Sequence, residues 1–156
     1  MGKVYVRAGL DDNRMRPRCR SAVQGRHNAV DVPTEEEEQT CLFRWAHYMA
    51  VQTCKELKLL HAIPNGGLRS KTEAARMKAA GVRAGVPDIC LPVARKGCHG
   101  LYIELKRREG GRISPEQMNW MYDLTAQGYR CMVCRGWEEA AKEIAEYMDL
   151  PEGSAP

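Results

Sequence analysis

The sequence has no apolar run near the roughly 20 residues that a membrane-spanning helix requires. Its N-terminal region is rich in arginine but lacks the apolar segment of a signal peptide. The first absence excludes a helical membrane protein, and the second disfavours secretion. We therefore expect a cytoplasmic protein that does not associate with a membrane.

The sequence also lacks the cysteine pattern of a disulfide-rich protein, because its seven cysteines are an odd number. Cys41, Cys90 and Cys131 lie within apolar runs, so we expect reduced thiols. Cys131 and Cys134 form one C-x-x-C motif with no second pair at zinc-finger spacing, which favours core packing over a zinc site. No Ser/His/Asp set and no G-K-S/T phosphate loop stands out as a competing catalytic motif.

Charge is unevenly distributed along the chain. Residues 1–33 hold seven Lys/Arg against three Asp/Glu, which accounts for the whole net charge of +4. Residues 69–112 hold eleven Lys/Arg against four acids, whereas residues 137–156 hold one against six. The basic middle of the chain is suited to binding a polyanion.

At 156 residues and 44% apolar composition, the chain is long enough for one globular core. We expect a basic arm over residues 1–33, a folded domain over 34–150 and a disordered tail over 151–156. Capping boxes at Thr34/Glu37 and Ser114/Gln117 predict two helix starts. The first helix is expected to run to about Leu60, and the second to near Gly128.

Apolar runs predict strands near residues 61–63, 88–93, 100–106 and 129–134. Further helices are expected over 72–81 and 136–148. The order of elements therefore predicts a mixed α/β domain in which helices flank a small mixed β-sheet.

Three charged residues interrupt two of the apolar strands. Residues two apart in a strand face the same side, so Glu104 and Lys106 share one face. Asp88 joins them if residues 94–100 close a hairpin. Carboxylates on adjacent strands can bind Mg²⁺ through oxygen and leave positions for water and a phosphate. A salt bridge on an edge strand is the alternative interpretation.

The first helix offers a third acid from the run Glu35 to Glu38. On a helical wheel Glu35 falls at the centre of the apolar face, Glu38 falls on its flank, and Glu36 and Glu37 point to solvent. That face was defined by the positions of Leu42, Ala46, Met49 and Thr53. The wheel favours Glu35 but leaves Glu38 open, and a solvated acidic first turn is the alternative.

The spacing of Pro87-Asp88 and Glu104-Leu105-Lys106 resembles the signature of the PD-(D/E)XK nuclease superfamily. The motifs PNGG, GVPD, IELK, SPEQ and GW, in this order, resemble the VRR-NUC domain family in the stand-alone form found in phages and bacteria. The similarity extends over about residues 35–147. It implies a restriction-endonuclease-like core.

The resemblance implies a metal-dependent DNA endonuclease in which Glu35, Asp88 and Glu104 bind Mg²⁺ or Mn²⁺. Lys106 would polarise the attacking water. Gln117, from the SPEQ motif, would support the site, although its place in the capping box explains it equally well. Stand-alone members look like homodimers that cut branched DNA such as four-way junctions, so we expect a homodimer in a bacterial or phage-infected cell.

Basic and polar residues around the expected site are candidates for contact with nucleic acid. The retained alternative is a non-catalytic nucleic-acid-binding module with the same fold, for which buried carboxylates would have no use. The candidate contact residues are Asn65, Arg69, Lys71, Arg83, Arg107, Arg108 and Arg112.

Overall fold

A computed structural model describes residues 32–64 and 70–156. Asn65 and Arg69 lie outside the described residues, as do residues 1–31 of the expected arm over 1–33, and the side chain of Lys71 is not described. The four α-helices are α1 (Glu35–Gln52), α2 (Lys71–Ala79), α3 (Pro115–Ala126) and α4 (Trp137–Tyr147). The four strands are β1 (His61–Ala62), β2 (Ile89–Leu91), β3 (Leu101–Lys106) and β4 (Arg130–Arg135).

The strands form one mixed sheet in the order β1-β2-β3-β4. β2 pairs antiparallel with β1 and with β3, so residues 88–106 do form the expected hairpin. β4 runs parallel to β3, and α3 provides the crossover between them. The prediction of a mixed α/β domain is confirmed.

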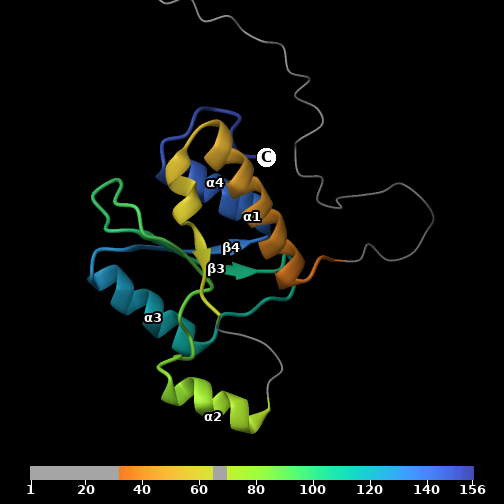
Figure 1. Cartoon of the computed structure of the whole chain (residues 1–156), viewed down its shortest axis with the longest axis vertical. Coiled ribbons are helices and arrows are strands. Elements are labelled where there is room, and N and C mark those ends of the chain that lie inside the picture. The colour runs from red at the N-terminus through yellow and green to blue at the C-terminus, as the bar shows by residue number, and fades with distance from the viewer. Residues whose placement is uncertain (1–31, 65–69) are drawn as a thin grey trace, which may run out of the picture.

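Helices cover both faces of this sheet (Figure 1). α1 and α4 pack together over one face, against the side chains of Ile103 and Leu105. α3 lies on the other side, next to β4. Because side chains alternate along β3, the same strand that anchors the core turns Glu104 and Lys106 towards α3.

Both predicted capping boxes are present. The Thr34 and Ser114 side chains each accept a hydrogen bond from the N3 backbone N–H, and the Glu37 and Gln117 side chains accept one from the N-cap backbone N–H. The first helix, however, ends at Gln52 and not near Leu60. Thr53 leaves the helical conformation with φ −134°, and residues 55–59 continue as a separate 3₁₀ helix.

The structure differs from two further expectations at the surface of α1. Among the described residues five cysteines are free, but Cys41 is disulfide-bonded, so the expectation of reduced thiols is wrong at this half-buried position. Residues 151–156 were expected to be a disordered tail. In the structure they lie against α1, where the Trp45 indole N–H donates to the Ser154 carbonyl at 2.8 Å.

No helix in the described part of the chain has the length and apolar character to cross a membrane.

Tyr147 on α4 closes the core beneath the turn after β2. Its side chain is fully buried, and its hydroxyl donates to the Val93 carbonyl at 2.7 Å and accepts from the Arg95 N–H at 3.2 Å. Replacing it with phenylalanine would leave the Val93 carbonyl without this donor, whereas the Arg95 N–H would keep its bond to the Cys98 carbonyl at 3.2 Å.

We expect Tyr147→Phe to lower the free energy of unfolding by about 1–3 kcal/mol, the usual cost of an unsatisfied buried group. Tyr122→Phe is the matched control, because Tyr122 is 76% exposed. Urea unfolding followed by circular dichroism measures both. Equal stability of the two variants would contradict this role for Tyr147.

Candidate active site

The pairing of β2 with β3 places two carboxylates side by side. Ile89 pairs with Ile103, so extending the register by one residue sets Asp88 opposite Glu104. Opposite residues of an antiparallel pair point to the same face. The Asp88 carboxylate also accepts the backbone N–H of Leu105 at 3.1 Å, which fixes it against β3.

Glu104 carries the most deeply buried carboxylate of this group, with no exposed surface. Its Oε1 accepts hydrogen bonds from Lys106 and Gln117. Its Oε2 is buried and has no donor among the described residues. Burial raises the pKa of Glu104 to about 7; the Asp88 charge adds to this rise, and the Lys106 hydrogen bond opposes it.

The pKa of Asp88 is shifted by the same environment. Burial raises its pKa, while the charge of Lys106 and the Leu105 N–H act in the opposite direction. Two carboxylates that both resist ionisation therefore act on each other, and Oε2 of Glu104 has no donor among the described residues. A proton or a cation at that point would relieve the repulsion.

Lys106 is the positive charge at this site. Burial on its own would lower the pKa of Lys106, but the hydrogen bond to Glu104 and the charges of Glu35 and Asp88 outweigh burial and raise it. Its ammonium also lies 3.3 Å from the Leu105 carbonyl and 3.9 Å from Glu35. Lys106 is therefore held as a cation and is unsuited to act as a general base.

Gln117 has two functions at once. Its side-chain oxygen accepts the Ser114 N–H at 2.8 Å, as the capping box requires, and its side-chain nitrogen donates to Glu104. The two interpretations of Gln117 that the sequence offered are compatible, because they use opposite ends of one carboxamide.

The structure corrects the choice of buried acid on α1. Glu38 is 1% exposed, whereas the Glu35 side chain is 49% exposed. The helical wheel had included Thr53, which is exposed and lies beyond the end of α1. The buried stripe instead runs from Glu38 through Leu42, Trp45, Ala46 and Met49.

Glu38 nonetheless has both oxygens engaged away from Asp88 and Glu104. One accepts from Arg108 Nε at 2.8 Å, and the other accepts the Trp137 N–H at 2.9 Å. It therefore caps α4, whose N-cap residue Gly136 has no side chain to do so. A helix that starts with glycine was the signal in the sequence that an acceptor must come from elsewhere.

The basic residues predicted to contact nucleic acid divide into two groups. Arg83, Arg107 and Arg112 are exposed. Arg108 instead forms ion pairs with Glu38 and Glu138, which sequence analysis missed. Those pairs hold Arg108 in place, but its side chain is 42% exposed and its contact with nucleic acid stays a prediction.

The donor set of Asp88 and Glu104 suits a hard divalent cation. Asp88 and Glu104 offer adjacent carboxylates and an unpartnered oxygen, as Mg²⁺ and Mn²⁺ require. Within residues 32–64 and 70–156 no three His, Cys, Asp or Glu side chains are grouped as a metal site. Glu35 lies at the edge, near Lys106, and its role as third ligand stays a prediction.

A mixed sheet flanked by helices, with an acid pair and a lysine on two adjacent strands, defines a domain of the nuclease type. The family model for the VRR-NUC domain matches residues 23–138. The chain therefore belongs to the VRR-NUC domain family.

A solved structure described as a VRR_NUC domain protein supports this assignment. It is 29% identical to this chain, with a TM-score of 0.65, and the alignment covers 77% of this chain and 92% of that one. No curated protein matches the chain.

Removing the Glu38 carboxylate would leave the Arg108 ion pair and the α4 N-terminus without their shared acceptor. We expect Glu38→Ala to lower the free energy of unfolding by about 3 kcal/mol. Glu36→Ala, two residues earlier and on the exposed side of the helix, should change it by about 0.5 kcal/mol or less. Urea unfolding measures both, and a small loss for Glu38→Ala would show that this network is dispensable.

Proposed function

We propose that the protein is a metal-dependent DNA endonuclease that hydrolyses phosphodiester bonds and prefers branched DNA such as four-way junctions. The observation that carries the proposal is the pairing of half-buried Asp88 with fully buried Glu104, whose Oε2 has no donor among the described residues, beside a protonated Lys106. A protein that only bound DNA would gain nothing from burying two carboxylates, which repel phosphate.

Each residue has a function that its surroundings support. Asp88 and Glu104 would hold Mg²⁺ or Mn²⁺, which when bound supplies charge neutralisation and makes water a nucleophile at neutral pH. Gln117 and Lys106 fix the orientation of Glu104. Lys106 also keeps a positive charge where the phosphate gains negative charge. Glu35, half exposed and 3.9 Å from Lys106, is available on the open side.

The preference for branched DNA and the homodimer are parts of the same proposal. Their support is the family assignment together with symmetry, because two sites related by a two-fold axis can cut both strands of a junction.

The decisive experiment is cleavage of single-stranded, duplex, flap and four-way DNA with Mg²⁺, Mn²⁺ or a chelator. We expect metal-dependent cleavage, fastest on the four-way junction. Asp88→Asn and Glu104→Gln should reduce it at least a thousandfold while DNA binding, measured by fluorescence anisotropy, is kept. Binding without cleavage by the wild-type protein under every condition would favour the alternative, a non-catalytic DNA-binding module.

The acidic run on α1 gives a second prediction. Glu35→Gln should reduce cleavage at least tenfold, because only this member of the run combines an open position with proximity to Lys106. Glu36→Gln and Glu37→Gln should retain near-normal rates. Single-turnover cleavage of one junction substrate compares the three. Similar losses for all three variants would mean that the run acts only through its summed charge.

A further inference from the structure

Positive charge is concentrated on α2 and the turn that follows it. Residues 71–83 contain four Lys/Arg and one acid, Glu73. Arg76, Lys78 and Arg83 are exposed, and none of them forms an ion pair with a carboxylate in the described part of the chain. This segment is therefore open to an external polyanion.

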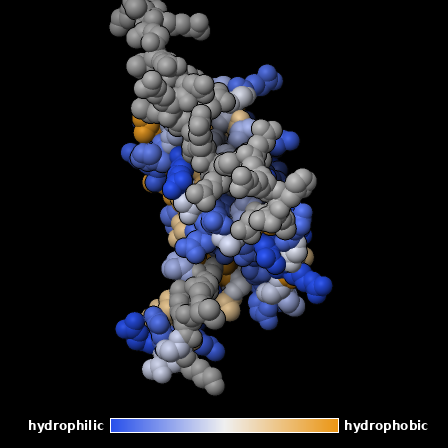
Figure 2. All heavy atoms as spheres, turned by 90° about the vertical axis from the view of Figure 1, so that its right-hand side faces the viewer, coloured by the Kyte–Doolittle hydropathy of each residue, from blue (hydrophilic) through white to orange (hydrophobic). Residues whose placement is uncertain are grey.

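α2 is also poorly packed against the rest of the protein. Of its side chains from Thr72 to Ala79, only Met77 is even half-buried. α2 lies at one end of the molecule, beyond the sheet and beside α3 (Figure 1), and Figure 2 shows both hydrophilic and mildly hydrophobic residues at that end. A nine-residue helix gains little stability alone, so a partner that contacts its free face would stabilise it.

The free face of α2 has a definite layout. At about 100° per residue, Arg76 and Lys78 lie on opposite sides of Met77, which turns towards the protein. The outward centre is then formed by the small residues Ala75 and Ala79. A duplex groove about 12 Å wide admits a helix and has a phosphate strand along each side. Cations on both edges of α2 match the two strands.

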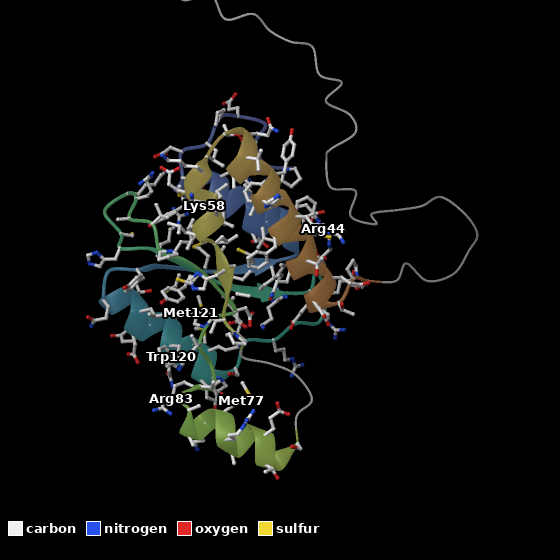
Figure 3. All side chains as sticks on the ribbon, in the orientation of Figure 1. Arg44, Lys58, Met77, Arg83, Trp120 and Met121 are labelled. Carbon is white, nitrogen blue, oxygen red and sulfur yellow. The ribbon has the colours of Figure 1, made fainter. Side chains whose placement is uncertain are left out.

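The turn after α2 is held against the candidate active site. The Trp120 indole N–H on α3 donates to the Ala84 carbonyl at 3.0 Å. Gly85, with φ +87°, lies so close to α3 that an added Cβ would be 2.7 Å from the backbone of Glu116. Asp88 follows three residues later, and Gln117 is the neighbour of Glu116. The junction near Arg83 and Trp120 is visible in Figure 3.

We propose that α2 grips duplex DNA next to the cut phosphate, with Arg76 and Lys78 contacting the backbones of its two strands. This inference rests on the proposed function, since it assumes that DNA is the substrate. It assigns binding to two residues outside the acid pair and predicts that duplex is held more strongly than single-stranded DNA.

The test measures DNA binding by the full-length Glu104→Gln protein, so that cleavage does not interfere. Arg76→Ala/Lys78→Ala is compared with Lys55→Ala/Lys58→Ala, an exposed pair of equal charge; Lys58 lies far from α2 in Figure 3. Alanine maintains the helix, because it has the highest helix propensity. Arg76→Lys/Lys78→Arg keeps both charges and serves as the conservative variant. Fluorescence anisotropy gives affinities for a duplex and for a single strand of the same length.

Loss of two phosphate contacts should flatten the slope of log affinity against log salt by roughly two and weaken duplex binding at least tenfold in about 0.1 M salt. The single strand should lose less, and the conservative and control variants should behave like the parent. An unchanged slope, an equal loss in the control pair or an equal loss on both DNAs would overturn the proposal. So would a change in molecular mass, which would assign α2 to a contact between subunits.

The experiments distinguish a failure of the proposed nuclease activity from a failure of the proposed DNA binding by α2. If the wild-type protein cleaves DNA while Arg76→Ala/Lys78→Ala binds like its parent, the nuclease stands and the role of α2 is rejected. If no nucleic acid is cleaved with any metal but the α2 variant loses duplex binding, the nuclease proposal is rejected. The DNA-binding role of α2 is then kept, in a non-catalytic module.

Discussion

The burial of the Glu104 carboxylate is the constraint on which the site depends. An ionised carboxylate with no exposure to water is costly unless donors or cations surround it. The sequence supplies Lys106 from the same strand face and Gln117 from α3, and both converge on one oxygen. The second oxygen is buried without a donor among the described residues, so one interaction of the carboxylate is left incomplete. That incompleteness distinguishes this cluster from an ordinary buried ion pair, which satisfies itself.

The acidic start of α1 shows how one sequence motif can serve separate purposes. Glu37 closes the capping box, Glu38 binds Arg108 and caps α4, and Glu35 remains half exposed beside Lys106. Because Glu38 ties α1 to α4 and to the chain just after Lys106, it also fixes where Glu35 lies. The fold and the site are thus joined through a residue that does not belong to the acid pair.

The features that the sequence predicted well are those fixed by local chemistry. Capping boxes set the starts of α1 and α3, and residue spacing along β3 placed Glu104 and Lys106 on one face. The position of Asp88 followed from one assumption, that residues 94–100 close a hairpin. What failed depended on partners distant in sequence. Glu38 is buried because Arg108 and the bare N-terminus of α4 surround it, and no helical wheel contains that information.

Gln117 links the dynamics of a helix end to the state of the acid pair. Helix ends fray, and the first turn of α3 stays closed partly because the Gln117 carboxamide oxygen holds the Ser114 N–H. The same carboxamide holds Glu104 through its nitrogen, so each opening of that turn also removes one of the two donors to the buried carboxylate and leaves Lys106 as the other. Hydrogen exchange at the Ser114 amide therefore reports on the lifetime of the ordered site, and Ser114, which touches neither acid, controls that lifetime through the helix cap.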